Sequence, residues 1–332
     1  MSISFSLEAP TVLALDLGAS RIRTAVVLED GTLLGRRATS TPRDAEQTLS
    51  ACAAELAQSL AEARAEGAAQ PYAVAICAPG PLDPQRGEFL DPPNLDRSLW
   101  RFPLATRLAE ALGMAALMER DTQVAALAEG RFGAAKGLSD YIYLTVSTGV
   151  GGAVVSGGRL LRGADGLAGE LGHMTIDMNG PRCGCGANGH LEAFASGTGI
   201  VNSARAAGHP AAQASEVAAR EEAGEPWAHE IMETARRAFA AAAVALVDVF
   251  NPQRIIVGGG VAMGQGDQLL QPARDAIAQT AFERQGSRVE VVPAQLGDDV
   301  GLIGAVPLLA LARIRATGDH GHLHIDPHND AT

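Results

Sequence analysis

Two patterns of apolar positions alternate along the chain. Short apolar runs that end in glycine or polar residues predict buried strands at 11–17, 22–28, 72–77, 141–146, 254–257 and 289–292. Longer segments, in which alanine and apolar residues recur at helical spacing, predict helices at 44–65, 104–112, 122–131, 227–250, 267–280 and 300–316. Strands that alternate with helices in this way are typical of an α/β protein.

One unit of this pattern occurs twice. The strand TVLALDL at 11–17 leads into a loop of small residues and a second strand, and YIYLTV at 141–146 leads into STGVGG and another strand. Self-similarity of this kind predicts two related α/β halves.

Composition narrows the classes of protein that fit. The 332 residues suit about two domains, and 47% hydrophobic with 19% charged residues excludes a disordered chain. The net charge of −12 argues against nucleic acid and anionic lipid as partners. No apolar run reaches the ~18 residues of a membrane helix, and no Lys or Arg of a signal peptide precedes Arg21. We therefore expect a soluble, cytoplasmic protein with neither a nucleic acid nor a membrane as partner.

Three loops after predicted strands carry residues suited to phosphate. Glycine lets backbone N–H groups approach phosphate oxygens, and a carboxylate such as Asp16 can hold a metal ion through water. Each loop alone is weak evidence, because a hairpin turn or tight strand–helix packing also favours glycine. Together they predict a polyphosphate site. The candidate ATP-binding and phosphate-binding residues are Asp16, Gly18, Ala19, Ser20, Ser147, Thr148, Gly149, Val150, Gly151, Gly258, Gly259 and Gly260.

A separate cluster of cysteine and histidine predicts a structural Zn²⁺ site. Cys183 and Cys185 are one residue apart, His190 follows after four residues, and His173 lies upstream. Two thiolates and two imidazoles form a closed tetrahedral set for zinc. The alternative is a pair of reduced surface thiols beside two unrelated histidines. We expect Cys52 and Cys77 to be ordinary buried residues.

The order of these motifs resembles one family. DLGAS, APGPLD with PNLD and Trp100, ERDTQVAAL, STGVGGAVVSGG, AGELGH, CGCGANGHLE and IIVGGG follow one another as in the ROK family of sugar kinases and repressors. The likeness runs from residue 11 to residue 316 and is most specific from Val146 to His173. It implies a two-domain α/β fold of the actin-like, ribonuclease H-like class with an interdomain cleft. It also implies Mg²⁺ and ATP as cofactors, a hexose substrate and a homodimer.

The resemblance also implies roles for single residues. Asp121 matches the catalytic base that takes the proton from the sugar hydroxyl, although an Asp before a helix would otherwise be taken for an N-cap. The resemblance also implies a zinc site that in the family more often has three Cys and one His, so that His190 stands here in place of a Cys. The implied sugar-binding residues are Asn94, Arg120, Asp121, Glu170, His173 and Glu192, and the metal ligands are His173, Cys183, Cys185 and His190.

One position departs from the family. Arg120 stands beside Asp121, where the family usually has Asn, and an Arg is larger, permanently charged and only a donor. It either pairs with Glu119 and turns away or contacts an anionic or differently placed group of the substrate.

The sequence therefore predicts an ATP-dependent kinase that phosphorylates glucose at the 6-hydroxyl. Alternatives are mannose, fructose or an N-acetylhexosamine as substrate, polyphosphate as donor, or a sugar-binding regulator without catalysis. Fifteen residues precede Asp16, so we expect no DNA-reading domain before it. We expect one domain at 1–118 plus 300–316, a second at 119–299 with the zinc loop, and a disordered tail at 317–332 whose four histidines could bind metal adventitiously.

Overall fold

The chain forms two compact α/β units in a computed structural model that describes residues 11–316. The first unit contains residues 11–132, 164–166 and 296–316, and the second contains 133–163 and 167–295. The first unit thus extends past the predicted boundary at residue 118, because the helix that follows packs on the last two helices of the chain. The predicted disordered tail at 317–332, with its histidines, lies outside the described residues.

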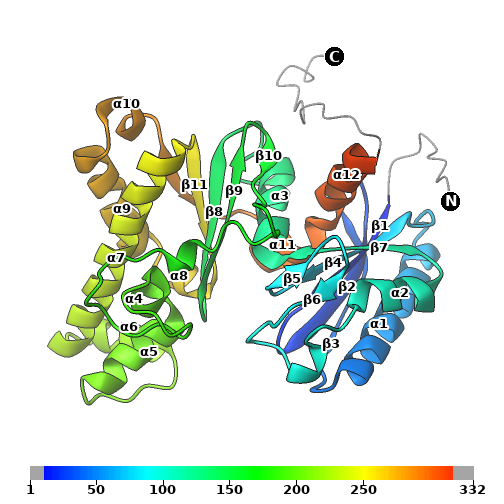
Figure 1. The fold of residues 1–332 in the computed structure, drawn as a ribbon, viewed down its shortest axis with the longest axis horizontal. Helices are drawn as coiled ribbons and strands as arrows, with labels where there is room; N and C mark the ends of the chain where they lie inside the picture. The colour runs from blue at the N-terminus through cyan, green and yellow to red at the C-terminus, as the bar shows by residue number, and fades with distance from the viewer. Residues whose placement is uncertain (1–10, 317–332) are drawn as a thin grey trace. The chain divides into compact units, whose positions relative to one another are not determined.

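The first unit is built on a five-stranded sheet, whose strands are labelled in Figure 1. Its strands are β1 (Val12–Leu17), β2 (Arg21–Val27), β3 (Leu33–Ser40), β4 (Ala73–Ala78) and β7 (Ala115–Arg120), in the order β3-β2-β1-β4-β7. The first three strands are antiparallel, whereas β4 and β7 run parallel to β1. All six residues of β1 and of β4 are buried, as their apolar runs predict.

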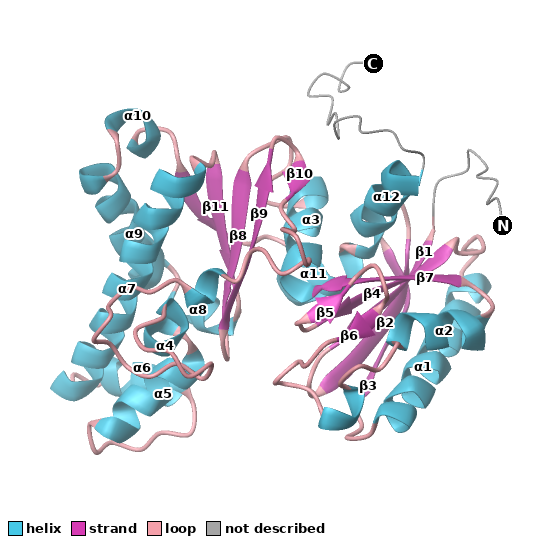
Figure 2. Cartoon of the chain, viewed as in Figure 1, coloured by secondary structure: helices cyan, strands magenta, loops and turns pink. Residues whose placement is uncertain are grey.

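Helices cover both faces of this sheet (Figure 2). On one face, α1 (Ala45–Ala65) packs against α2 (Leu104–Leu112); on the other, α3 (Asp121–Phe132) packs against α11 (Val300–Ile303) and α12 (Ala305–Ala316). The single helix expected at 300–316 is wrong, since it is interrupted at Gly304. A side chain there would collide with Val124 of α3, so the close approach of the helices requires a glycine.

Short elements complete the first unit. The strands β5 (Leu82–Asp83) and β6 (Glu88–Phe89) pair with each other, and the 3₁₀ helices η1 (Arg97–Leu99) and η3 (Gly297–Asp299) lie in its loops.

The second unit repeats the sheet topology of the first. It consists of β8 (Tyr141–Val146), β9 (Val150–Ser156), β10 (Arg159–Leu160), β11 (Arg254–Gly258) and β12 (Glu290–Pro293), in the order β10-β9-β8-β11-β12. Again the first three strands are antiparallel and the last two run parallel to the first strand of the unit. The two related halves predicted from the repeated strand–loop–strand pattern are confirmed.

Long helices bury one side of the second unit. The alanine-rich α7 (Pro226–Phe250) packs against α9 (Asp267–Thr280), and Phe239 and Leu246 are fully buried in the core. The smaller elements are η2 (Leu171–His173), α4 (Leu191–Ala195), α5 (Gly197–Ala206), α6 (Ala214–Glu222), α8 (Gly260–Gln265) and α10 (Glu283–Gly286). Among the described helices, none is both long enough and apolar enough to cross a membrane.

Candidate functional site

Polar residues gather where the parallel strands of the first unit end. The strands β1, β4 and β7 are neighbours, and their carboxyl ends carry Asp16, Cys77 and Asp121. Asp16 lies opposite Cys77 in the sheet register. Burial, together with the charges of Asp16 and Asp121, raises the pKa of the Cys77 thiol, so both carboxylates lie near it. The carboxyl ends of parallel strands are where α/β proteins hold their ligands.

The loop after β1 holds the first candidate phosphate-binding residues. The N–H of Gly18 donates to the carbonyl of Arg21 (2.8 Å), and Gly18 also accepts a hydrogen bond from the hydroxyl of Thr41 (2.7 Å). Ala19 and Ser20 are exposed at the tip of this turn. Asp16 is buried, and this burial raises the pKa of its carboxyl, while the charge of Arg23 opposes the rise.

Asp121 is exposed within an otherwise buried segment. Every other residue from 118 to 130 is buried. Asp121 is the first residue of α3, and its Oδ1 accepts a hydrogen bond from the N–H of Thr122 (2.7 Å). The carboxylate therefore stabilises the start of the helix, as an N-cap would, while it remains accessible to a substrate.

Arg120 is buried in a polar network of the first unit. With the Gln123 amide assigned in the orientation that satisfies both of its polar atoms, the guanidinium of Arg120 donates to the Gln123 oxygen (2.7 Å), and the Gln123 nitrogen donates to Glu119. Glu119, Arg120 and Gln123 are each at most 3% exposed. The stem of Arg120 lies against Gly80, where an added Cβ would be 2.8 Å from Cδ of Arg120. The structure thus connects Arg120 to Glu119 through Gln123.

Asn94 lies in an exposed loop between β6 and η1. Leu95 beside it is buried, and Trp100, which closes the loop, donates to the carbonyl of Pro92 (3.3 Å).

Both glycine loops of the second unit lie at one edge of its sheet. Residues 147–149 follow β8. Gly258 ends β11, the parallel neighbour of β8, and Gly259 and Gly260 lead into α8. Gly259 has a positive φ of 92°, and a Cβ there would be 2.6 Å from the hydroxyl oxygen of Thr145. Only glycine fits so close to the end of β8.

Glu192 fixes the 147–150 loop through contacts with its backbone. Its Oε2 accepts a hydrogen bond from the N–H of Val150 (3.0 Å), and a Cβ at Gly149 would be 2.6 Å from the same oxygen. The start of α5 also contacts the loop, since the N–H of Gly197 donates to the carbonyl of Ser147 (2.7 Å). The loop is therefore fixed by contacts that sequence spacing does not reveal.

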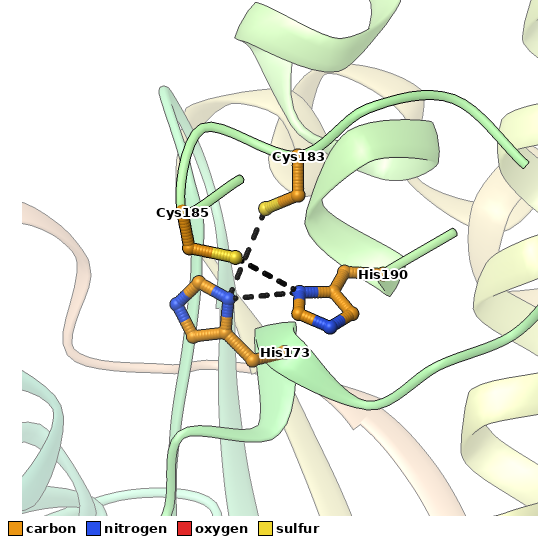
Figure 3. Close-up of side chains that lie close together, drawn as sticks. All are labelled: His173, Cys183, Cys185 and His190. Carbon is orange, nitrogen blue, oxygen red and sulfur yellow. Dashed lines mark hydrogen bonds between the residues drawn. The ribbon is translucent and has the colours of Figure 1, made fainter. Parts of the chain in front are cut away.

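The four predicted metal ligands lie together (Figure 3). The Nδ1 atoms of His173 and His190 are 3.2 Å apart, Sγ of Cys185 is 3.4 Å from Nδ1 of His190, and Sγ of Cys183 is 3.8 Å from Nδ1 of His173. One donor atom from each residue lies within 4.8 Å of all the others.

The three separations of 3.2, 3.4 and 3.8 Å are close to those of tetrahedral zinc, and the set as a whole, which spans up to 4.8 Å, would contract around a bound ion. Zn–S bonds of about 2.3 Å and Zn–N bonds of about 2.0–2.1 Å place tetrahedral donors roughly 3.3–3.8 Å apart. The backbone supports the arrangement, because the N–H of Cys183 donates to the carbonyl of Ala187 (2.8 Å) and closes the loop. Burial raises the pKa of the Cys183 thiol to about 11 in the absence of metal. A bound Zn²⁺ would favour the thiolate.

The remaining candidates border this cluster. Glu192 also accepts a hydrogen bond from the thiol of Cys183 (3.6 Å), so it connects the metal ligands to the 147–150 loop. Glu170 is exposed and precedes η2, which carries His173.

Sequence reasoning missed two residues. Gln123 orients Arg120, and Arg23 contacts Asp16. A charged residue inside the apolar strand 22–28 was the available signal for Arg23, but its partner depends on the register of the hairpin.

The comparisons with known proteins agree with this architecture. The model of the ROK family matches residues 12–312. The chain is 32% identical to the glucokinase of Thermotoga maritima over 90% of this chain and 96% of that protein. It is 36% identical to the N-acetylmannosamine kinase of Escherichia fergusonii over 90% and 98%. The crystal structure of the ROK hexokinase of Thermus thermophilus has a TM-score of 0.81 at 35% identity, covering 91% of this chain and 99% of that one.

The chain belongs to the ROK family. The predicted two-domain α/β fold of the actin-like class is confirmed. The chain spans about half (53%) of the bifunctional enzyme NanE/NanK of Brucella suis, to which it is 36% identical.

Proposed function

We propose that this protein is an ATP-dependent sugar kinase that phosphorylates the 6-hydroxyl of a hexose. The observation that carries the proposal is the exposed carboxylate of Asp121 in an otherwise buried segment, at the end of the sheet where Asp16 also lies. An alcohol that attacks a phosphoryl group needs a base, and a carboxylate is the usual one in kinases. Similarity to relatives named glucokinase and N-acetylmannosamine kinase supports the same reaction class.

The proposed reaction uses residues of both units. The oxygen of the sugar hydroxyl attacks the γ-phosphorus of ATP while Asp121 accepts the proton of that hydroxyl. The bond between the γ-phosphorus and the oxygen bridging it to the β-phosphate breaks, and ADP leaves. The backbone N–H groups of residues 18–20, 147–151 and 258–260 bind the phosphates, and Glu170, His173 and Glu192 orient the sugar. Asp16 would hold Mg²⁺ through water, and the ion would neutralise charge on the phosphates. Variants in either unit are thus expected to abolish the same activity.

Zinc is the proposed structural metal of the second unit. The donor separations around His173 and His190 support it, and Glu192 contacts both a ligand and the 147–150 loop. A bound ion would fix the loop that carries His173 and thereby the sugar side of the site.

Glucose is the first substrate that we propose. N-acetylmannosamine is the second, because identity to a relative named N-acetylmannosamine kinase (36%) exceeds identity to the glucokinase (32%). A homodimer remains a prediction from the family resemblance. Size-exclusion chromatography with light scattering tests it by measuring the mass of the protein in solution.

An assay of ADP release across a panel of sugars tests the proposal. The panel contains glucose, mannose, fructose, N-acetylglucosamine and N-acetylmannosamine, each with ATP and with polyphosphate, and a sugar-free reaction controls for ATP hydrolysis. We expect sugar-dependent ADP release, highest with one hexose, and a product that carries phosphate at position 6. Sugar binding by calorimetry without phosphorylation of any panel member would overturn the kinase assignment and support a regulator.

A further inference from the structure

The carboxylate of Asp16 already has a cationic partner. Asp16 at the end of β1 and Arg23 in β2 are direct cross-strand partners, and Nη2 of Arg23 contacts Oδ2 of Asp16. The side chain of Asp16 is 12% exposed and that of Arg23 is 27% exposed. The guanidinium is therefore the more exposed member of the pair.

A second contact fixes the guanidinium from another segment. Nη1 of Arg23 donates to the carbonyl of Asp298 in η3 (2.5 Å). Three residues later, Gly301 in α11 faces the carboxylate, and a Cβ there would be 2.6 Å from Oδ2 of Asp16. Asp16 thus lies where β1, β2 and the 297–301 segment converge, beside the exposed turn at 18–20.

The electrostatics of this arrangement suit a polyanion. Burial disfavours the charged form of Asp16, and the charge of Arg23 is the largest influence that favours it. A triphosphate near Asp16 meets a negative charge unless cations separate the two. A guanidinium has five donors in a planar fork, and the contacts with Asp16 and Asp298 use two of its nitrogens.

We propose that Arg23 is a further phosphate-binding residue of the nucleotide site, which orients Asp16 and donates to a phosphate of the bound nucleotide. The inference rests on the proposed kinase function. It differs from a purely structural ion pair, because a structural pair would serve the fold without affecting nucleotide affinity.

The chain offers a matched control. Arg36 in β3 donates to Asp299 (2.5 Å), the residue next to Asp298, so it also ties the sheet to the 297–301 segment. Its side chain is 55% exposed, and its partner is not at the end of a central strand. Arg36→Met removes an arginine and an anchor of the same segment but leaves Asp16 and Arg23 in place.

The experiment compares Arg23→Met, Arg23→Lys and Arg36→Met with the parent protein. Calorimetry measures the affinity for Mg·ADP and, separately, for the preferred sugar, and the ADP-release assay gives kcat and the KM for ATP. Charge-assisted hydrogen bonds are worth enough for roughly a ten- to hundredfold loss of affinity. We expect that loss of Mg·ADP affinity in Arg23→Met, a smaller loss in Arg23→Lys, and values within about twofold of the parent in Arg36→Met.

Sugar affinity identifies a merely structural effect. We expect it to stay within about twofold of the parent in all three variants. Mg·ADP affinity in Arg23→Met equal to that of the parent would overturn the inference. So would an equal loss in Arg36→Met, or a parallel loss of sugar binding, because Arg23 would then only hold the segment. A parent protein that binds Mg·ADP but phosphorylates no sugar would instead overturn the kinase proposal and leave the binding test of Arg23 intact.

Discussion

The two units share one sheet topology but carry different residue types at the corresponding edge of each sheet, where the parallel strands end. In the first unit, the strand ends present the carboxylates of Asp16 and Asp121. In the second unit, the corresponding ends present glycine and hydroxyl residues at 147–149 and 258–260. The fold therefore supplies a common position, and the residue types decide its chemistry. We propose that both units bind phosphate there through their loops and that only the first unit adds carboxylates for a proton and a cation.

The two edges are also stabilised differently. In the first unit, the residues that flank Asp121 in sequence, Glu119, Arg120 and Gln123, form a buried polar network. The 147–150 loop is held by Glu192, which also contacts Cys183 of the predicted zinc cluster. We infer that the first edge depends on its hydrogen-bond network and the second on a metal ion.

The largest expected effect is on turnover, from Asp121→Asn in the first unit. Asn has nearly the shape of Asp but cannot accept a proton, and general-base catalysis contributes about 10²–10⁴-fold. We expect kcat to fall by that factor and sugar affinity to persist. Asp44→Asn is the control, because Asp44 caps α1 by accepting from the N–H of Gln47 (3.0 Å) and Asn caps equally well. Turnover of Asp121→Asn within a few-fold of the parent would show that Asp121 only caps its helix.

Next in size is the effect of removing a metal ligand from the second unit. The protein should contain about one Zn per chain, and Cys185→Ser should weaken zinc binding by at least about 100-fold, since even outer-shell changes cost 10–100-fold. Metal analysis and a competitive chelator titration measure it. Cys52→Ala, which removes a buried thiol in α1, should keep its zinc. A parent protein that is metal-free and fully active would contradict the assignment.

Gly149→Ala should have a smaller effect, confined to the second edge. Its Cβ would lie 2.6 Å from Oε2 of Glu192, so the loop or the carboxylate must move. Overpacking costs about 1–3 kcal/mol, and where this strain falls on nucleotide binding it raises the KM for ATP roughly five- to a hundredfold. Gly264→Ala, in open space in α8, should leave both KM values unchanged. An unchanged KM for ATP in Gly149→Ala would remove this loop from the nucleotide site.

The smallest effect on catalysis is expected from Arg120→Asn. The shorter side chain cannot fill the space over Gly80 or reach Gln123 as the guanidinium does, so the free energy of unfolding should fall by about 1–3 kcal/mol. We expect the ratio of activities toward any two sugars of the panel to change by less than about tenfold. Chemical denaturation and the ADP-release panel measure the two, with the exposed Arg131→Asn as control. A reversal of the sugar preference at unchanged stability would make Arg120 a substrate contact instead.

The periodic patterns predicted most elements with good accuracy. The strand at 141–146 and the helices at 104–112 and 267–280 have the predicted bounds. The helices α5 and α6 were not predicted, and the helix expected at 300–316 is interrupted at Gly304. Gly304 lies so close to Val124, on a helix far away in sequence, that a Cβ would not fit there. Local periodicity carries no information about such a contact.

The candidate site divides in the same way. The zinc ligands were predicted from spacing and do lie together, since three of them share one short loop. The partner of Arg120 was left open, because its choice depends on the turn of α3 that brings Gln123 beneath it. Arg23 and the contact of Glu192 with Val150 could not be found at all, as hairpin register and loop docking decide them.

The sequence by itself therefore determined the α/β class, the doubled strand–loop–strand pattern, the family and the chemical inventory of the site. These depend on residue type and on spacing along the chain, which burial and hydrogen-bond periodicity relate directly to local structure. Only the tertiary structure decided which side chains meet, such as Asp16 with Arg23 or Glu192 with the 147–150 loop. The reason is physical: such contacts form when sheets pair and helices pack, and each brings together segments whose separation in sequence sets no distance in space.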